Sequence, residues 1–366
     1  MIPSRCKEDL VMFAQMESAG LEDLHFATDP NTGLRAIIAI HSTVRGPAIG
    51  GCRLIAYASD ADAITDAIRL ARGMSYKAAL AGLPHGGAKA VIMQPAGDYD
   101  RRALMVAFGQ FIDKLGGRYI TAMDSGTQVQ DMDAIATRTH WVSCTSRTGN
   151  PSPSTALGVF EGIGSAVRHK LGRHSLCGIR VALQGLGHVG FEVARLLHEA
   201  GAQLTVCDLD EQRCARAVQA FGARRVDPGD IYGVEADVFS PCGLGAVLND
   251  DSIPKLRSGI IAGSANNQLA EERHGEMLHQ RGILYAPDYL INAGGLVFVA
   301  LNHARAPAQD ISAKVHQIGA ELQALFRQAD ALDTATSLLA DQRAETIIAA
   351  GVQTAGECRE SAANTQ

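Results

Sequence analysis

Residues 180–208, RVALQGLGHVGFEVARLLHEAGAQLTVCD, decide the fold that we expect for this chain. The segment opens with the short apolar run Arg180–Gln184, which predicts a buried strand. Apolar residues then recur at helical spacing from Val189 to Leu197, and residues 203–208 predict a second strand. A strand, a helix and a second strand in this order form a βαβ unit, whose two strands lie parallel.

Shorter apolar segments after this unit extend the pattern. They lie at residues 238–239, 260–262 and 283–285. Strands and helices that alternate in this way predict a doubly wound parallel sheet, so the fold class that we expect is α/β. The composition agrees, because 38 glycines and only 5% aromatic residues favour many tight strand-to-helix turns over a β-sandwich.

The turn between the first strand and the helix has the pattern G-x-G-x-x-G. Its six residues are Gly185, Leu186, Gly187, His188, Val189 and Gly190. Gly185 permits a sharp turn, Gly187 lets the backbone approach a pyrophosphate, and Gly190 allows close packing of the helix on the strand. Alone, the pattern is also typical of an ordinary tight turn. Its place between a strand and a helix indicates a dinucleotide site, with the helix N-terminus towards the phosphates.

Asp208 ends the second strand and predicts the choice of coenzyme. It follows the motif by about 20 residues, as the dinucleotide fingerprint requires. Its carboxylate can accept hydrogen bonds from both ribose hydroxyls, whereas its charge repels a 2′-phosphate. The sequence therefore favours NAD over NADP. Arg213, on the helix that follows, is expected to be solvated.

The charge and the cysteines argue against several classes of protein. A formal net charge of −6 without a Lys/Arg-rich stripe argues against a nucleic-acid binder. The eight cysteines are scattered and form no CxxC pair, so we expect neither a metal site nor a disulfide framework. The chain shows no signal-peptide pattern and no apolar run long enough to cross a membrane. We therefore expect a cytoplasmic protein that binds neither nucleic acid nor membrane.

The length of 366 residues predicts about two domains. Residues 147–154, RTGNPSPS, are dense in turn formers and predict a hinge. We therefore expect a first domain over residues 1–147 and a second over 148–325, with helices at about 326–366 that pack back on the first.

Within the first domain, three segments have clear periodicity. Residues 36–41 and 90–93 predict strands. Apolar residues at three- and four-residue steps predict a helix that runs towards Lys77, with Asp60 as its N-cap.

Glycines, two lysines and an acid also gather in the first domain. They are Gly50 and Gly51, the run MSYK at 74–77, GGAK at 86–89 and TAMD at 121–124. Two lysines on glycine-flanked segments with an acid favour anion recognition and proton transfer. One lysine would hold a carboxylate, while burial or a neighbouring cation would lower the pKa of the other so that it acts as a base. From the residues alone, two alternatives stay open: each lysine is a solvated surface charge, or GGAK cradles a phosphate.

Longer motifs, some of which include these segments, are spread over about residues 20–350. They are IIAIH at 37–41, GPAIGGCR at 46–53, LARGMSYK at 70–77, GGAK at 86–89, GNPSP at 149–153, GSANNQ at 263–268 and APDYLINAGG at 286–295. On these motifs the chain resembles the Glu/Leu/Phe/Val amino-acid dehydrogenase family, and most closely its leucine and valine dehydrogenase branch.

The resemblance implies an activity and its catalytic residues. Lys89 matches the catalytic lysine, and Asp124 matches its acid–base partner. The implied reaction is the reversible, NAD-dependent oxidative deamination of an amino acid to a 2-oxo acid and ammonia. Hydride leaves Cα for NAD, Lys89 activates the water that attacks the imine, and Asp124 transfers protons as ammonia leaves. Closure of a cleft about the hinge would exclude water.

The resemblance also implies which residues bind the two substrates. Those for the amino acid are Lys77, which grips the carboxylate, Met74, Gly50 and Gly51, and, around the side chain, Ile49, Ala122, Leu296 and Val299. Those for the coenzyme, besides the glycine motif and Asp208, are Asn266 and Asn292. The first domain would be the substrate-binding and oligomerisation domain of a homo-oligomer, and the second would bind the dinucleotide.

The side-chain pocket implied in this way is apolar throughout. Glutamate-specific relatives carry a lysine where this chain has Ile49, and burying a second carboxylate unpaired would cost several kcal/mol. A branched aliphatic amino acid is therefore the first expectation. Because apolar pockets discriminate a methylene by only about 1–3 kcal/mol, leucine, valine and isoleucine are not separated.

Five residues near the expected site depart from the family pattern. They are Met123, Ser125, Gln128, Ser154 and Phe298. Either they reflect drift in the packing behind the site, or they shift the substrate towards a larger or aromatic amino acid.

Two other functions are weighed against deamination. A 2-hydroxy-acid dehydrogenase would need a histidine base and a substrate-gripping arginine in place of the lysine pair. A catalytically inactive NAD-binding regulator would be easier to accept if Lys77, Lys89 or Asp124 were missing, and all three are present.

Overall fold

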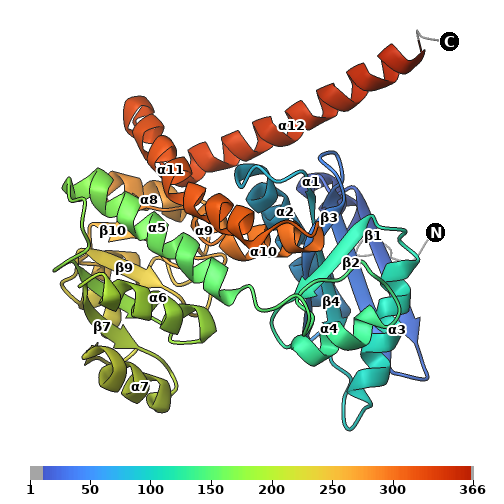
Figure 1. Ribbon diagram of the computed structural model, residues 1–366, viewed down its shortest axis with the longest axis horizontal. Helices are drawn as coiled ribbons and strands as arrows, with labels where there is room; N and C mark the ends of the chain where they lie inside the picture. The colour runs from blue at the N-terminus through green and yellow to red at the C-terminus, as the bar shows by residue number, and fades with distance from the viewer. Residues whose placement is uncertain (1–10, 364–366) are drawn as a thin grey trace, which may run out of the picture. The chain divides into compact units, whose positions relative to one another are not determined.

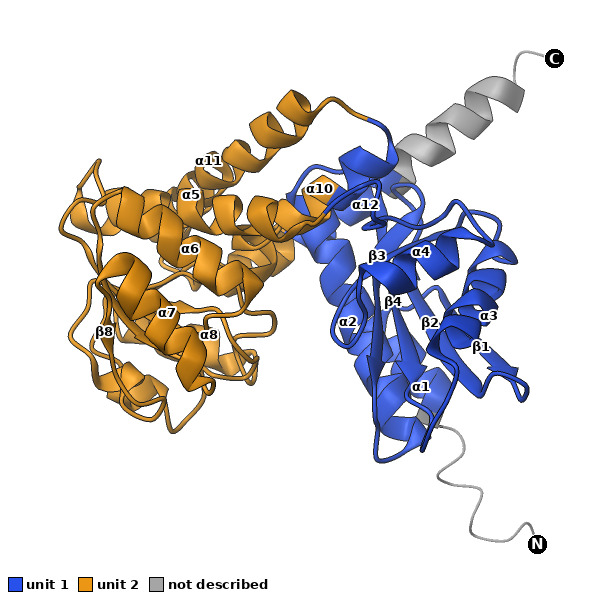
Figure 2. Ribbon diagram, turned by 60° about the horizontal axis from the view of Figure 1, so that its bottom comes forward, with its two compact units in different colours: residues 1–149, 299–305, 344–366 blue, residues 150–298, 306–343 orange. Residues whose placement is uncertain are grey.

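The computed structural model describes residues 11–363, with side chains from residue 12 to residue 351. The chain divides into two compact units, which Figure 2 shows in different colours. Unit 1 comprises the chain up to Gly149, Val299–Arg305 and the chain from Ala344; unit 2 comprises Asn150–Phe298 and Ala306–Arg343. No helix in the described residues is long and apolar enough to cross a membrane.

Unit 1 is built on a mixed five-stranded sheet in the order β1-β2-β4-β3-β5 (Figure 1). Its strands are β1 (Asp23–Asp29), β2 (Leu34–Ser42), β3 (Ala48–Ile55), β4 (Gly86–Met93) and β5 (Tyr119–Met123). β2 pairs antiparallel with β1 and β4, whereas β3 lies parallel to β4 and β5. The strands predicted at 36–41 and 90–93 lie in β2 and β4. Both strands are buried along nearly their whole length, which explains their almost continuous apolar sequence.

Four helices accompany this sheet in the first part of unit 1. They are α1 (Val11–Ala19), α2 (Asp60–Leu80), α3 (Arg101–Asp113) and α4 (Val129–Ala136). α2 confirms the predicted helix, but its N-cap is Ser59, and Asp60 is its first residue. The side chain of Ser59 caps its N-terminus by accepting a hydrogen bond from the backbone N–H of Asp62. Ala63, Ala67 and Ala71 are fully buried, so α2 packs closely on β2 and β4.

Unit 2 is built on a six-stranded sheet in the order β11-β10-β9-β6-β7-β8. Its strands are β6 (Arg180–Gln184), β7 (Gln203–Cys207), β8 (Arg224–Arg225), β9 (Val238–Pro241), β10 (Ile260–Ile261) and β11 (Leu284–Tyr285). All neighbouring strands are parallel, which confirms the doubly wound sheet predicted from residues 180–208. β6 and β7 are joined by α6 (His188–Glu199), and β7 and β8 by α7 (Glu211–Phe221), as βαβ units require.

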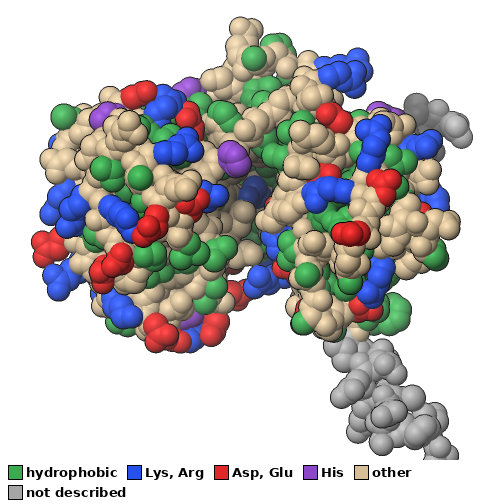
Figure 3. Space-filling view, turned by 90° about the horizontal axis from the view of Figure 1, so that it is seen from below, with side chains coloured by type: hydrophobic (Ala, Val, Ile, Leu, Met, Phe, Trp, Pro, Cys, Tyr) green, Lys and Arg blue, Asp and Glu red, His purple; other side chains and the backbone are tan. Residues whose placement is uncertain are grey.

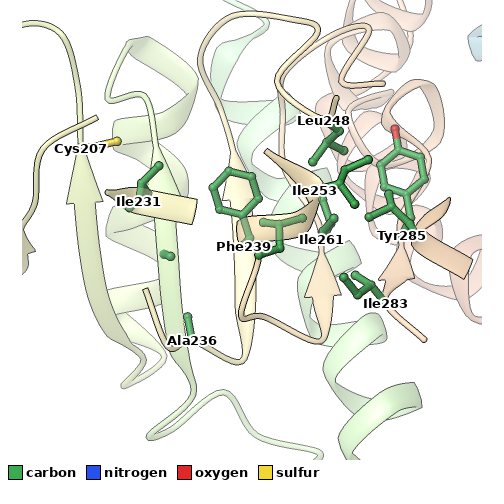
Figure 4. Close-up of a cluster of buried hydrophobic side chains, with 12 residues drawn as sticks. Cys207, Ile231, Ala236, Phe239, Leu248, Ile253, Ile261, Ile283 and Tyr285 are labelled. Atoms are coloured by element: carbon green, nitrogen blue, oxygen red, sulfur yellow. The ribbon is translucent and has the colours of Figure 1, made fainter. Parts of the chain in front are cut away.

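Apolar side chains from several parallel strands and their connections fill one core of unit 2 (Figure 4). Phe239 on β9, Ile261 on β10 and Tyr285 on β11 lie beside Leu248 and Ile253 from the connecting segment. These side chains are 5% exposed or less. They fix the strands that follow the glycine motif.

The remaining elements of unit 2 and of the C-terminal part are mostly helical. They are α5 (Ser152–Leu171), η2 (Ile231–Gly233), η3 (Ile253–Lys255), α8 (Arg273–Gln280), α9 (Asp288–Ile291), α10 (Gly294–His303), α11 (Ala308–Leu332) and α12 (Thr336–Ala363). On the face that Figure 3 shows, acidic and basic side chains are interspersed on each unit.

The grouping of the C-terminal helices differs from our expectation for 326–366. α11 packs along α5 within unit 2, because Gly158 and Gly162 leave room for the side chains of Ile318 and Leu322. Residues up to Arg343 therefore belong to unit 2. Only the chain from Ala344 groups with unit 1.

This later part of α12 is held to unit 1 by side-chain hydrogen bonds. The hydroxyl of Tyr76 donates to Glu345 over 2.6 Å, and Arg45 donates to the carbonyl of Ile347 over 3.3 Å.

The predicted hinge at 147–154 is partly helical. Pro151 precedes the first residue of α5, and proline with its fixed φ suits the start of a helix. Residues 152–154 thus belong to α5, and the units divide between Gly149 and Asn150.

Candidate active site

Glycines let three elements of unit 1 approach one another closely. A Cβ on Gly50 of β3 would lie 1.7 Å from the carbonyl oxygen of Ala88 on β4. A Cβ on Gly87 of β4 would lie 2.0 Å from the backbone nitrogen of Ser75 on α2. At both positions the neighbour is backbone, which cannot rotate away, so only glycine fits.

Lys89 and Asp124 form an ion pair within this packing. Lys89, on β4, is only 6% exposed, and its Nζ lies 2.8 Å from Oδ2 of Asp124, which directly follows β5. β3 lies between β4 and β5 in the sheet. A Cβ on Gly51 of β3 would lie 2.7 Å from the Cβ of Asp124. The missing side chain at Gly51 therefore leaves the space in which Asp124 reaches Lys89.

A second cation binds the same oxygen of Asp124. Nε of Arg53 lies 3.2 Å from Oδ2, and the Asp124 side chain is 19% exposed. Burial raises the pKa of Asp124, but the charges and hydrogen bonds of Lys89 and Arg53 outweigh it and hold the pKa at about 2. Asp124 is therefore a carboxylate at neutral pH. It is placed to exchange a proton with Lys89.

Two hydroxyl groups fix the backbone around this pair. The hydroxyl of Thr127 accepts a hydrogen bond from the backbone N–H of Asp124 over 2.9 Å and lies 3.0 Å from the carbonyl oxygen of Cys52. The hydroxyl of Tyr119 donates to the carbonyl of Gly50 over 2.8 Å, and Tyr119 is fully buried. The turn that carries Asp124 and the peptide of Gly50 are thus each held by a side chain.

Lys77 and Met74 lie in the last two turns of α2, and both are half-buried. The contact of Gly87 with Ser75 brings this part of α2 against the strand that carries Lys89.

The four residues expected around the substrate side chain are all apolar and buried. They are Ile49 at 0%, Ala122 at 5%, Leu296 at 6% and Val299 at 5% exposure. On the adjacent strands β3 and β5, Ile49 pairs with Ile120 and Gly51 pairs with Ala122. Ile49 and Ala122 are therefore offset by two residues in this register. Val299 belongs to unit 1, whereas Leu296 belongs to unit 2.

The glycine motif of unit 2 forms the turn that its sequence predicts. Gly185 has a φ of +96°, which disfavours any residue with a side chain. A Cβ on Gly190 would lie 2.0 Å from the carbonyl oxygen of Gly185, whereas a Cβ on Gly187 would meet nothing within 4 Å. The turn is therefore tight on the inside and open at Gly187, where α6 begins. This geometry fits a pyrophosphate at the N-terminus of α6.

Asp208 is held beside this turn by two backbone hydrogen bonds. Oδ2 accepts from the N–H of Leu186 over 2.6 Å, and Oδ1 accepts from the N–H of Asp210 over 2.8 Å. Arg213 is exposed, as expected. Its Nη1 lies 3.8 Å from Oδ2 of Asp208 and its Nε 3.4 Å from Oδ2 of Asp210.

The two asparagines expected to bind the coenzyme contact each other. Nδ2 of Asn292 donates to Oδ1 of Asn266 over 2.9 Å and to the carbonyl of Ser264 over 3.1 Å. The side chain of Asn292 is thus used in positioning Asn266 and the loop that carries it.

The structure gives one departure from the family pattern a structural role. Gln128 caps the N-terminus of α4 in a reciprocal arrangement with Asp131, whose carboxylate accepts from the backbone N–H of Gln128 over 2.8 Å. Arg101 binds the same carboxylate. Nothing in the structure explains Met123, Ser125, Ser154 or Phe298 in this way.

Arg53, Tyr119 and Thr127 are three residues that our sequence analysis did not single out. Arg53 closes the motif GPAIGGCR, and this was the available signal. Tyr119 and Thr127 lie in none of the quoted motifs, and their contacts with Gly50 and Cys52 join residues 69 and 75 apart in the sequence. In the part of the chain with described side chains, no group of three or more His, Cys, Asp or Glu is placed to hold a metal ion.

Comparison with known proteins covers both units. Residues 23–141 match the Glu/Leu/Phe/Val dehydrogenase dimerisation domain, and residues 206–356 match the Glutamate/Leucine/Phenylalanine/Valine dehydrogenase family.

Individual relatives match over nearly their whole length. The chain is 48% identical over 338 residues to leucine dehydrogenase of Geobacillus stearothermophilus, covering 91% of this chain and 92% of that protein. It is 42% identical over 339 residues to L-tryptophan dehydrogenase of Nostoc punctiforme, covering 92% and 96%. The crystal structure of L-tryptophan dehydrogenase from Nostoc punctiforme matches with a TM-score of 0.80, at 41% identity over 93% of this chain and 99% of that chain. The chain belongs to the Glu/Leu/Phe/Val dehydrogenase family and is an amino-acid dehydrogenase, an oxidoreductase that acts on CH–NH₂ groups.

Proposed function

We propose that this enzyme catalyses the reversible, NAD-dependent oxidative deamination of a branched aliphatic L-amino acid, with leucine, valine and isoleucine as the candidates. The observation that carries the proposal is the buried contact between Lys89 and Asp124, 2.8 Å from Nζ to Oδ2. It brings a base and a proton acceptor together beside the glycine-lined strand β3.

In the proposed reaction, the residues of unit 1 bind and transform the amino acid. Lys77, supported by Met74 and the backbone of Gly50 and Gly51, holds the α-carboxylate. Lys89 takes a proton from the water that adds to the imine carbon. Asp124 then relays that proton from Lys89 to the amine nitrogen. The C–N bond breaks, ammonia leaves, and the hydroxyl proton passes to Lys89 as the carbonyl forms.

The coenzyme residues that we propose lie in unit 2. They are Gly185, Leu186, Gly187, His188, Val189, Gly190, Asp208, Asn266 and Asn292. NAD, when bound, supplies the hydride acceptor. The family uses NAD(P), and we propose NAD because the half-buried carboxylate of Asp208, fixed beside the motif by Leu186, would repel a 2′-phosphate.

The substrate assignment rests on the lining of the expected pocket. Ile49, Ala122, Leu296 and Val299 are apolar, and none offers a partner for a second carboxylate. The relative named leucine dehydrogenase is also more similar to this chain than the one named L-tryptophan dehydrogenase. We further propose that the chain forms a homo-oligomer through the segment that matches the dimerisation domain.

A screen of 2-oxo acids with ammonium and NADH tests this function. We expect ammonium-dependent NADH oxidation with branched aliphatic 2-oxo acids, and little with 2-oxoglutarate. Higher turnover with phenylpyruvate or indolepyruvate would replace the aliphatic assignment by an aromatic one. Reduction that does not need ammonium would instead indicate a 2-hydroxy-acid dehydrogenase.

The variant Lys89→Ala tests the proposed base. We expect kcat to fall by about 10²–10⁴-fold, because a positioned acid–base group contributes this much. NADH binding, measured by fluorescence titration, should not change, since the proposed coenzyme residues lie in unit 2. Full turnover in this variant would remove Lys89 from the mechanism, and NADH binding without turnover on any 2-oxo acid in the wild type would favour the inactive regulator.

A further inference from the structure

Arg53 connects the Lys89–Asp124 pair to a second acid. Its Nε lies 3.2 Å from Oδ2 of Asp124, and its Nη1 lies 2.8 Å from Oδ2 of Asp66 on α2. The same oxygen of Asp66 accepts a hydrogen bond from the hydroxyl of Tyr57 over 2.7 Å. Each end of the guanidinium is therefore bound to a carboxylate, and the arginine side chain is only 20% exposed.

The contacts of Asp124 are unevenly distributed between its two oxygens. Lys89 and Arg53 both bind Oδ2. Among the described side chains, no cation or hydrogen-bond donor binds Oδ1. Arg53 thus restrains the carboxylate through one oxygen and leaves the other available to a proton.

A lysine in place of Arg53 would not reproduce this arrangement. A guanidinium offers several N–H groups in a fixed plane, so it can bind two acids at once, whereas an ammonium is a single point charge. Arg53 also keeps its charge throughout the reaction, because arginine does not lose its proton in proteins. Lys89 changes its charge in the proposed mechanism. Arg53 is therefore the constant positive charge beside Asp124.

We propose that Arg53 is a positioning residue for the deamination, which holds Asp124 in place through Oδ2 while Asp124 and Lys89 exchange a proton. The proposal rests on the function proposed above. Arg53 acts through Asp124 and does not itself touch the substrate. Asp66, with Tyr57 behind it, holds Arg53 in place.

The test compares two substitutions at position 53 with a control. Arg53→Gln removes the positive charge. Arg53→Lys keeps the charge but loses the planar guanidinium with its several N–H donors. Arg118→Gln is the control, because Arg118 binds Glu22 and Asp23 in the same unit and does not contact Asp124. For each protein we measure kcat and KM with ammonium, NADH and the best 2-oxo acid over a range of pH. NADH affinity and the thermal melting curve are measured alongside.

For Arg53→Gln we expect kcat to fall at least tenfold while NADH affinity stays at the wild-type value. Loss of the positive charge favours protonation of the coupled Lys89–Asp124 pair, so the acid limb of the pH profile should move to higher pH. Arg53→Lys should restore the position of the acid limb but not the full kcat. Arg118→Gln should match the wild type in kcat and in the position of the acid limb.

Several results would overturn the proposal. A wild-type kcat and pH profile in Arg53→Gln would show that Arg53 is not needed. A lower kcat with an unshifted acid limb, equal in Arg53→Gln and Arg53→Lys, would show a purely structural role. If Arg53→Gln does not fold, Arg53→Lys is the deciding variant. A wild-type kcat in Arg53→Lys would show that the planar guanidinium is not needed. Absence of ammonium-dependent turnover in the wild type would instead refute the proposed function itself.

Discussion

Acid should weaken unit 1 in part through the carboxylate of Asp124. Its pKa in the folded protein is about 2, against an ordinary value of 3.8. Because the folded-state pKa is lower, the ionised form stabilises the fold above the unfolded-state pKa, and this stabilisation disappears as the pH falls through the folded-state pKa. A difference of almost two units corresponds to about 2 kcal/mol, and the side chain is buried enough that solvent screens little of it. Most of this free energy should be lost between about pH 4 and pH 2.

The perturbation is Asp124→Asn, compared with the wild type at each pH. Other carboxylates also titrate in this range, but they titrate in both proteins, so the difference between the two unfolding free energies isolates Asp124. At neutral pH the variant leaves Lys89 and Arg53 without their shared counter-charge, which should cost about 3–5 kcal/mol. As the pH falls to about 2.5, the difference in unfolding free energy between the wild type and Asp124→Asn should decrease by more than about 1 kcal/mol.

The assay uses the single tryptophan of the chain. Trp141 lies in unit 1, and its ring is 4.1 Å from that of His140 and 6.0 Å from that of His303. Its fluorescence therefore reports the unfolding of the unit that contains Asp124. Urea titrations at fixed protein concentration give the unfolding free energy at about pH 6, 4 and 2.5. A gap between wild type and variant that stays constant over this range would refute the reasoning, because Asp124 would then titrate alike in the folded and unfolded chain.

Three substitutions test the close contacts and the coenzyme site. Gly50→Ala should lower the unfolding free energy by about 3 kcal/mol or more, since its Cβ would lie 1.7 Å from the carbonyl oxygen of Ala88; an unchanged tryptophan-fluorescence melt would contradict this. Gly190→Ala should weaken NADH binding at least tenfold in a fluorescence titration, because its Cβ would lie 2.0 Å from the carbonyl oxygen of Gly185; wild-type affinity would show that the turn can adjust. Asp208→Ser should raise the ratio of kcat/KM for NADPH over NADH by about tenfold or more by removing the like charge, and an unchanged ratio would assign coenzyme choice to other residues.

Local patterns predicted the parts of the fold whose signals lie close together in sequence. The βαβ unit at 180–208 and the helix from Asp60 were predicted because strand and helix periodicities are properties of ten to twenty neighbouring residues. The start of α5 was assigned to the hinge at 147–154, because Asn150, Pro151 and Ser152 are turn formers that also suit a helix N-terminus. The part of the chain that packs back on unit 1 was placed from about residue 326 and begins at Ala344, because helix periodicity shows that one face is buried and not which element covers it.

In the candidate site, too, residue types were predictable from the sequence, whereas contacts between distant residues were not. Lys89, Asp124 and the glycines were identifiable by residue type and motif. The contact of Arg53 with Asp124 joins residues 71 apart, and that of Tyr119 with Gly50 joins residues 69 apart. Such contacts follow from the order of strands β4, β3 and β5 in the sheet, which no local pattern specifies.

The sequence by itself determined the class of fold, the position of the glycine turn and the residue types available for acid–base chemistry, because these depend on local geometry and on the chemistry of single side chains. Only the tertiary structure decided that Asp124 binds two cations through one oxygen and that Asp66 restrains one of them. The physical reason is that charges interact through space. Their effect on one another depends on distance and burial, which the chain acquires only when β3, β4, β5 and α2 pack together.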